Sequence, residues 1–174
     1  SNGFSLCRKV FDIDSNNPEL YIPREELGGK TIAEALLVPT KIYVKPVLAL
    51  LEKVNVKGIS HITGGGFYEN IPRMYADKTL VSVIKKGSWE IPPIFAELER
   101  RGADPSRMFN TFNMGIGLVL AVEADKADNI IKTFEEFTVS SNAGLNSTMK
   151  AYKIGRVARA GQKVETQADA VIFE

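Results

Sequence analysis

The sequence predicts a single α+β domain covering residues 1–174. Its length and its 44% hydrophobic content suit one core that is stable without disulfides or a structural metal. Apolar residues recur at helical spacing in some segments and alternate at strand spacing in others, and the two kinds of segment follow one another along the chain. Short strands close the sequence, where we expect antiparallel pairing.

The N-terminal half is expected to be mainly helical. Phe4, Cys7 and Phe11 share one face of the first helix, and Thr31 is suited to cap the second. Pro46 stands near the start of a third helix, whose apolar residues again have helical spacing. The elements expected here are helices over residues 4–13, 32–37 and 46–54 and a strand over residues 58–63.

The C-terminal half is expected to mix strands and helices more evenly. One helix opens at Pro92 and ends at Gly102, and Asp125 is suited to cap another. Gly115 and Gly117 are two residues apart in an apolar run, which places them on one face of a strand. The elements expected here are a helical turn over residues 67–74, strands over 80–84, 114–122, 152–158 and 170–173, helices over 92–102 and 125–137, and a loop over 140–150.

Charge and composition exclude several classes of protein. Lys and Arg number 22 against 21 Asp and Glu, and the cations are scattered, so no nucleic-acid footprint is expected. Cys7 is the single cysteine, which excludes an intramolecular disulfide and a Cys-rich zinc site. No apolar run is long enough to cross a bilayer. We expect a soluble, cytoplasmic protein, and the start at Ser1 without a Met suggests a piece of a longer chain.

The triplet Gly64, Gly65 and Gly66 directly follows the strand expected over residues 58–63. Three residues without Cβ atoms allow successive backbone N–H groups to converge on an anion such as phosphate. The alternative is that the glycines only permit a tight turn from strand to helix. The triplet lacks the Gly-Lys-Ser/Thr ending of a phosphate-binding P-loop and the dinucleotide fingerprint.

His61 is the only histidine, so imidazole proton transfer near neutral pH would have to use it. The alternative is a hydrogen-bonded packing role within the strand. Beyond the glycines, Glu69 and Asn70 are candidates to orient a polar ligand, although Asn70 is equally suited to close a turn. No acidic pair has a metal-binding spacing, so no metal ligands are predicted.

Two asparagines, Asn110 and Asn113, precede the apolar run that contains Gly115 and Gly117. Their amides suit recognition of amide or hydroxyl groups, and the glycines allow close approach of a ligand or another backbone. The alternative is a helix end followed by a tightly packed strand.

Several motifs together resemble one family. Residues 61–73 read HITGGGFYENIPR and closely resemble the signature of the phosphoribosylformylglycinamidine cyclo-ligase, or AIR synthetase, family. The family's blocks His-Ser-Asn-Gly-Tyr-Ser-Leu, Pro-Thr-Arg-Ile-Tyr, Phe-Arg-Thr-Phe-Asn-Met-Gly-Ile-Gly and Ala-Trp-Lys-Ile-Gly are similar to residues 1–6, 38–48, 109–117 and 151–155. The resemblance covers nearly the whole chain but only the C-terminal half of the family's enzymes.

The resemblance implies a three-layer α/β/α sandwich with a mixed sheet, partly ferredoxin-like, that packs against a missing N-terminal ATP-binding domain. In the family, ATP phosphorylates the amide oxygen of formylglycinamidine ribonucleotide, and an internal nitrogen displaces phosphate to form aminoimidazole ribonucleotide. ATP and Mg²⁺ would be bound mainly by the missing domain, the complete enzyme would be a homodimer, and the isolated domain would be inactive.

The resemblance also implies roles for individual residues. His61 is the catalytic candidate. Lys41 stands where the family often has Arg, so a point charge replaces a planar fork that could bind phosphate through two hydrogen bonds. The candidates for binding substrate or phosphate are Thr63, Gly64, Gly65, Gly66, Ser1, Asn2, Asn110 and Asn113.

Two alternatives to this assignment remain. One is the C-terminal half of another ATP-using relative, of the selenophosphate synthetase or thiamin-monophosphate kinase type. The other is a noncatalytic module that binds a phosphorylated ligand.

Overall fold

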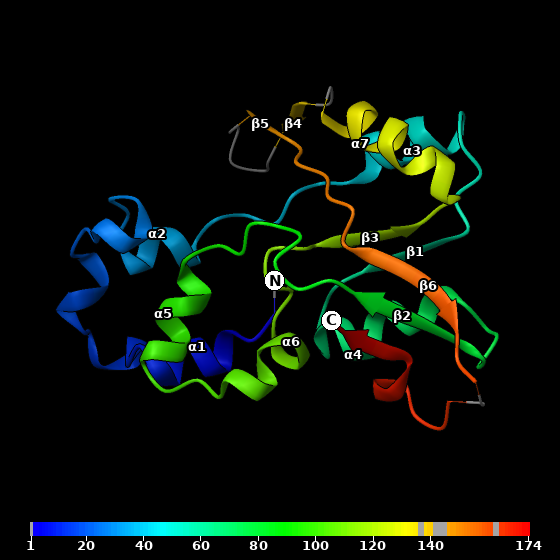
Figure 1. Cartoon of the computed structure of the whole chain (residues 1–174). Coiled ribbons are helices and arrows are strands. Elements are labelled where there is room, and N and C mark those ends of the chain that lie inside the picture. The colour runs from blue at the N-terminus through cyan, green and yellow to red at the C-terminus, as the bar shows by residue number, and fades with distance from the viewer. Residues whose placement is uncertain (1, 136–137, 141–145, 162–163) are drawn as a thin grey trace.

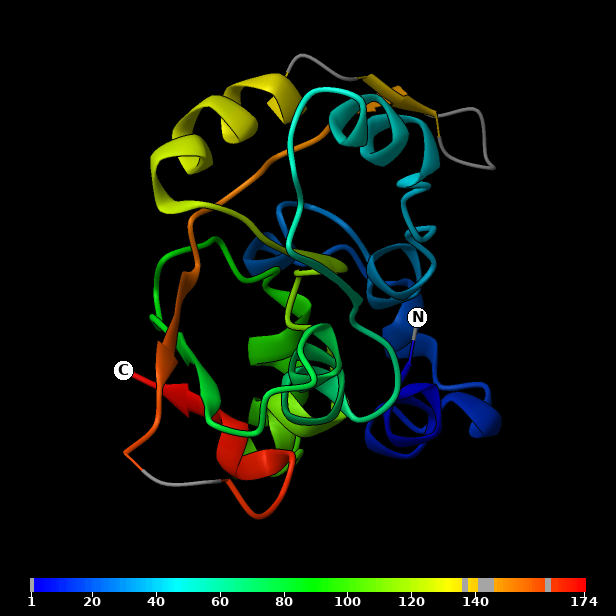
Figure 2. The same ribbon diagram turned by 90° about the vertical axis from the view of Figure 1, so that its right-hand side faces the viewer.

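The computed structural model describes residues 2–135, 138–140, 146–161 and 164–174 and confirms the α+β class (Figure 1). Views from two directions show helices above the central strands and further helices below them (Figures 1 and 2). The α-helices are α1 (Phe4–Val10), α2 (Ile32–Leu36), α3 (Val44–Leu51), α4 (Gly66–Asn70), α5 (Ile94–Arg100), α6 (Met108–Thr111) and α7 (Ala127–Glu135). The strands are β1 (Gly58–His61), β2 (Leu80–Ile84), β3 (Leu118–Ala121), β4 (Thr138–Ser140), β5 (Asn146–Thr148), β6 (Gly155–Arg159) and β7 (Val171–Phe173).

The mixed sheet has β2 in its centre. β6 pairs antiparallel with one edge of β2, and β7 pairs parallel with the other. Because β2 has a neighbour on each side and is covered on both faces, its residues from Val81 to Ile84 are all buried. The antiparallel pairing expected near the chain end is confirmed for β6, whereas β7 pairs parallel with β2 and not with β6.

β1 and β3 form a separate antiparallel pair, with His61 opposite Leu118. The strand expected from residue 114 begins only at Leu118, so this prediction is wrong for its first four residues. Met114 and Gly115 have φ angles of 49° and 93°, which belong to a turn. The N–H of Ile116 closes that turn on the carbonyl oxygen of Asn113 at 2.9 Å. Gly115 and Gly117 therefore do not share a strand face.

Aromatic side chains fill the main core. Phe67 stacks on Trp89 with ring centroids 5.7 Å apart, and Phe109 meets Phe67 edge-on at 5.4 Å. The indole N–H of Trp89 donates to the carbonyl oxygen of Met114 at 2.9 Å. A second core cluster joins α3 to α7; its buried members are Leu50, Ile130, Phe134 and Met149.

A buried carboxylate ties α5 to the N-terminal segment. Glu97, only 3% exposed, accepts hydrogen bonds from Arg100 Nε at 2.7 Å and Arg101 Nε at 2.7 Å. Arg101 also donates through Nη2 to Glu19 at 2.6 Å. Burial alone would raise the pKa of Glu97, but the arginine hydrogen bonds outweigh burial and hold that pKa below its ordinary value.

The helix boundaries test several further predictions. Thr31 caps α2 as expected, within a capping box in which Thr31 Oγ1 accepts from the N–H of Glu34 at 3.1 Å. Asp125 does not cap α7, because it lies inside a 3-10 turn whose N-cap is Glu123. The 3-10 helices span Ile13–Ser15, Pro18–Tyr21, Glu25–Leu27, Ile71–Met74, Pro105–Arg107, Ala124–Lys126 and Ala168–Ala170.

Two other predictions concern side-chain faces and the region after α7. Cys7 and Phe11 are buried as expected, whereas Phe4 is 42% exposed. The loop expected over residues 140–150 is interrupted by β5, which pairs with β4. Residues 136 and 137, the expected end of the helix over 125–137, lie outside the described residues.

Candidate anion-binding site

The glycine loop, residues 63–66, connects the end of β1 to the start of α4. Ile62 anchors the loop, since its side chain is 1% exposed and its N–H donates to the carbonyl oxygen of Gly117 at 2.9 Å. A strand followed at once by glycines and a helix was the feature that the sequence singled out, and the structure confirms this local arrangement.

Close packing explains why glycine occupies position 66. Gly66 has a φ of +57°, and a Cβ atom there would collide with the carbonyl oxygen of Phe109. This contact brings α4 directly against α6. The N–H of Gly66 donates to the carbonyl oxygen of Thr63 at 3.0 Å, so that N–H is not available to a ligand. Gly66 therefore positions the loop rather than adding a donor to it.

The N–H groups of Gly64 and Gly65 remain as candidate donors. Neither of them donates to a protein acceptor within the described residues. A Cβ built on Gly64 meets no atom within 4 Å, so open space borders the loop at this position. A Cβ built on Gly65 would instead collide with the Glu69 carboxylate, so the loop is open to an incoming anion on the Gly64 side. The three donors that the glycine triplet predicts are thus reduced to two.

Asn70 braces the loop from behind. Its side chain is only 2% exposed, and Nδ2 donates to the carbonyl oxygens of Gly66 at 2.8 Å, Gly64 at 3.1 Å and Thr63 at 3.3 Å. Its Oδ1 accepts from Thr63 Oγ1 at 3.2 Å and Arg73 Nη1 at 3.1 Å. Of the two roles that the sequence left open for Asn70, the structure therefore shows closing a turn.

Replacing Asn70 by alanine is expected to destabilise the domain by about 2–3 kcal/mol, because loop carbonyls would lose their donor in a buried position. Urea unfolding of Asn70→Ala should show this loss. Asn129→Ala is the matched control, since Asn129 is an exposed asparagine on α7. An Asn70→Ala variant as stable as the control would contradict the bracing role.

His61 ends β1 with its side chain exposed rather than buried in the core. Ser60 and Ile62 on either side are buried, as the alternation of the strand predicts. The imidazole lies edge-to-face with the ring of Tyr43, with centroids 6.1 Å apart. Gly117 permits this arrangement, because a Cβ there would collide with the Tyr43 hydroxyl. Burial raises the pKa of Tyr43, so its hydroxyl stays protonated at neutral pH.

The candidate asparagines lie in two places. Asn110 is on α6, where its backbone borders Gly66. Asn2 donates through Nδ2 to the carbonyl oxygen of Thr111, the last residue of α6. Asn113 Oδ1 accepts from the N–H of Gly115 at 3.0 Å and so supports the turn there. Ser1 lies outside the described residues. The structure thus brings Asn110, but not Asn113, to the glycine loop through this direct backbone contact.

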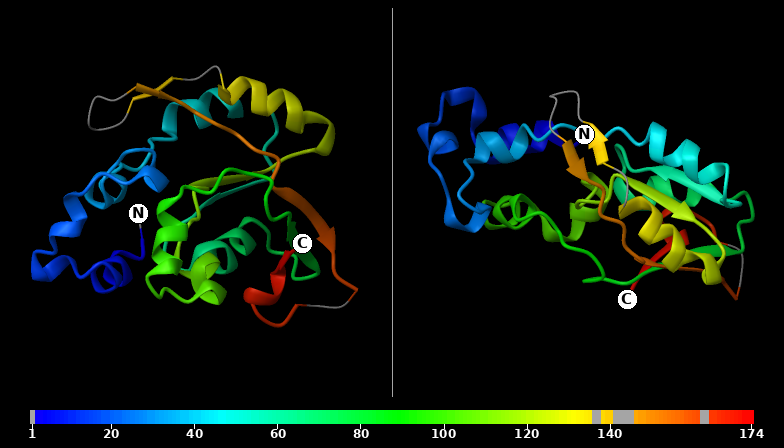
Figure 3. Two further views of the ribbon diagram at one scale, coloured as in Figure 1. Left: turned by 60° about the vertical axis from the view of Figure 1, so that its left-hand side comes forward. Right: turned by 90° about the horizontal axis from the view of Figure 1, so that it is seen from above.

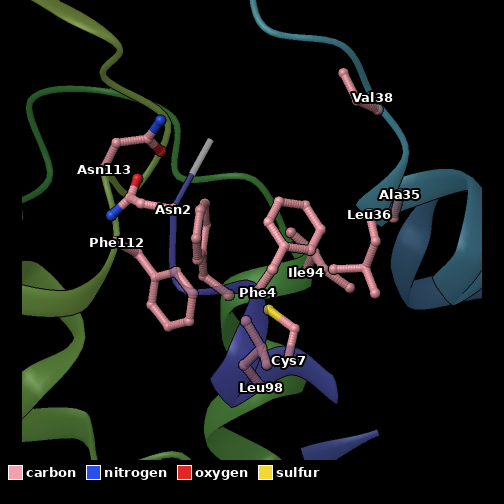
Figure 4. Close-up of a pocket in the computed structure, with 11 residues that line it drawn as sticks. Asn2, Phe4, Cys7, Ala35, Leu36, Val38, Ile94, Leu98, Phe112 and Asn113 are labelled. Atoms are coloured by element: carbon pink, nitrogen blue, oxygen red, sulfur yellow. The ribbon is translucent and has the colours of Figure 1, made fainter. Parts of the chain in front are cut away.

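Asn2 and Asn113 border an apolar cavity of about 120 Å³ between α1, α2 and α5 (Figure 4). Cys7 contributes its thiol to this cavity, and burial raises the pKa of that thiol to about 11. The thiol is therefore protonated at neutral pH and is a poor nucleophile. The remaining lining residues are Phe4, Ala35, Leu36, Val38, Ile94, Phe95, Leu98 and Phe112.

Two searches of the described residues bear on ligands and membranes. No group of three or more His, Cys, Asp or Glu side chains there could hold a metal ion. None of the helices described is both long and apolar enough to cross a membrane.

The glycine loop and its fold have relatives among known proteins. Residues 1–168 match the family model described as AIR synthase related protein, C-terminal domain. The chain belongs to this family.

Curated relatives give the family a more particular name. The chain is 48% identical over 165 residues to the phosphoribosylformylglycinamidine cyclo-ligase of Clostridium perfringens. The matched region covers 94% of the chain and 44% of the relative. It is 54% identical over 142 residues to the protein of that name in Caldicellulosiruptor bescii, covering 81% of the chain and 41% of the relative. The chain therefore spans less than half the length of these relatives.

Proposed function

We propose that this chain is the C-terminal domain of an ATP-dependent cyclo-ligase that converts formylglycinamidine ribonucleotide to aminoimidazole ribonucleotide in purine biosynthesis. The observation that carries the proposal is the pair of unengaged N–H groups at Gly64 and Gly65 in a loop held by Asn70, with open space beside Gly64 and the Glu69 carboxylate beside Gly65. The names of the relatives support a cyclo-ligase as the enzyme class.

The reaction needs stabilisation of negative charge on oxygen. The amide oxygen attacks the γ-phosphorus of ATP, the bond to the β-phosphate oxygen breaks, and ADP leaves with that electron pair. An internal nitrogen of the substrate then attacks the activated carbon and closes the ring, the carbon–oxygen bond breaks, phosphate leaves with the electron pair, and the nitrogen loses a proton. In this proposal Gly64 and Gly65 donate hydrogen bonds to the phosphoryl oxygens, because fixed donors stabilise developing charge without reorganising. His61, exposed three residues before Gly64, exchanges the proton.

The residues described fit a phosphate better than they fit Mg²⁺. Backbone donors are present at the loop, whereas the described side chains contain no carboxylate cluster for a metal. In the complete enzyme, an N-terminal domain would hold most of the ATP and the Mg²⁺. We also propose that this enzyme is a cytoplasmic homodimer and that the isolated chain binds phosphate without catalysing cyclisation.

Titration with inorganic phosphate tests the donor pair in the isolated chain. The backbone ¹⁵N–¹H signals of Gly64 and Gly65 should shift in a saturable way, because an anion would withdraw electron density from their N–H bonds. The signals of Gly29 and Gly115, whose N–H groups already donate within the chain, serve as controls. Equal shifts at all four glycines would mean nonspecific binding and would count against the proposal.

Replacing His61 by asparagine in the complete enzyme tests proton transfer. If His61 exchanges the proton, His61→Asn should lower kcat at least tenfold, since acid–base groups contribute about 10²–10⁴ in rate. One limb of the pH–rate profile should also disappear. A uniform fall in rate with both limbs preserved would leave His61 without a role in proton transfer.

A further inference from the structure

Helix α3 is apolar on both of its faces, although only one face meets the core. Leu50 is 1% exposed and packs with Ile130 and Phe134 of α7. On the outer side, Val44, Leu48 and Leu51 follow the spacing i, i+4, i+7. Their exposed fractions are 60%, 57% and 45%. A helix that is hydrophobic all round is normally buried on every side. The outer face of α3 is exposed instead, so we infer that a partner covers it in the complete protein.

The exposed apolar surface continues toward α2. Leu37 and Val38 are 78% and 58% exposed, and Ile42 follows at 40%. We call Leu37, Val38, Ile42, Val44, Leu48 and Leu51 the apolar strip. Exposed apolar side chains concentrated in one stretch of the chain, residues 37–51, indicate an interaction site, whereas single scattered ones need no partner.

The start of the chain lies beside the strip. Asn2 lines the same cavity as Val38, and the N-terminus is next to the connector between α2 and α3 in Figures 1 and 3. The chain matches a C-terminal domain and less than half of its relatives' length, so the additional sequence of those relatives precedes it. A segment joined at Asn2 would be held close to the strip, which raises its effective concentration there.

We propose that the apolar strip is the docking surface for the N-terminal domain that precedes this region in the relatives. The inference rests on the proposed function in one respect, because both require an N-terminal domain joined to this chain. It further specifies the occupant: an apolar face of the N-terminal domain covers α3, in preference to a second copy of this chain. Attachment beside the strip favours the tethered domain over a free copy, which has no such advantage.

Thiol labelling tests the docking surface in a complete chain. The N-terminal domain of the Clostridium perfringens relative would be joined to this chain, and Leu48→Cys would be labelled with a maleimide in the joined and the isolated forms. Labelling should be at least tenfold slower in the joined form. Ile22→Cys is the matched control, because Ile22 is 53% exposed and lies outside the strip. Its labelling should be equally fast in both forms.

The same samples contain a folding check and separate the two proposals. Cys7 is buried, so it stays slow to label only while the domain is folded. Equal labelling of Leu48→Cys in both folded forms would overturn the docking proposal. Slow labelling that already appears in the isolated chain, together with a dimer in sedimentation, would assign the strip to a second copy instead. Protection of Leu48→Cys in a joined protein without cyclo-ligase activity would support docking and count against the proposed function.

Discussion

Replacing Gly66 by alanine is expected to destabilise the domain by more than about 3 kcal/mol, the largest effect of any single methyl at the glycine loop. The added Cβ would collide with the carbonyl oxygen of Phe109, a backbone atom that cannot rotate away. The φ of +57° at this position adds further strain for any residue other than glycine. Relieving the collision and the backbone strain would force α4 away from α6 and disturb the aromatic core behind these helices. Urea unfolding measures the loss.

Gly64→Ala is the matched control within the same loop. Its methyl group meets no protein atom within 4 Å, and Gly64 has no positive φ, so stability should change by less than about 1 kcal/mol. In the complete enzyme the same methyl would intrude on the open space beside the candidate donors. We therefore expect a folded protein with lower kcat/KM. A Gly66→Ala variant as stable as Gly64→Ala would refute the packing role of Gly66, and full activity of Gly64→Ala would weaken the anion site.

Replacing Glu97 by glutamine is expected to cost on the order of 1–2 kcal/mol at neutral pH, because charge-assisted hydrogen bonds become weaker neutral ones. Arg100 and Arg101 would both lose their carboxylate partner. Arg101 would keep Glu19 as a partner, which limits the damage. Glu99→Gln is the control, because Glu99 is an exposed glutamate on the same helix. Equal stability of the two variants would contradict a stabilising role of the buried carboxylate.

The effect of Glu97→Gln should also depend on pH. The pKa of Glu97 is lower in the folded chain than in the unfolded chain, so the folded state binds this proton less readily. Its stabilisation is present above the unfolded pKa and is lost as the pH falls through the folded pKa. The difference in unfolding free energy between wild type and Glu97→Gln should therefore shrink in acid. A difference that stays constant from neutral pH to strong acid would exclude the ionised carboxylate as its source.

Local sequence patterns predicted the elements that depend on near neighbours. The strand Leu80–Ile84 has the expected bounds, because a continuous apolar run fits a strand buried on both faces. The capping residue Thr31 is also as expected, since a cap depends on contacts three residues apart. The glycine loop at the end of β1 was identified for the same reason: strand, glycines and helix are consecutive in the sequence.

Features that depend on distant contacts could not be predicted in this way. Met114 adopts a positive φ, which its residue type does not favour, in a turn whose carbonyl is bound by Trp89. The inward direction of Asn70 depends on how α4 folds back over the loop. The hydrogen bond from the N–H of Gly66 to the carbonyl oxygen of Thr63 also depends on the turn geometry. For this reason the number of free donors predicted from the glycine triplet was too high.

The buried indole has a practical consequence for studying this chain. Trp89 is the single tryptophan of the sequence and is 6% exposed. It stacks on Phe67, the residue that directly follows Gly66. Tryptophan fluorescence of this chain therefore reports on one site. The emission of Trp89 should be blue-shifted in the native state and should move to longer wavelength when α4 detaches from the core. Optical spectroscopy can thus follow the region around the candidate site without an added dye.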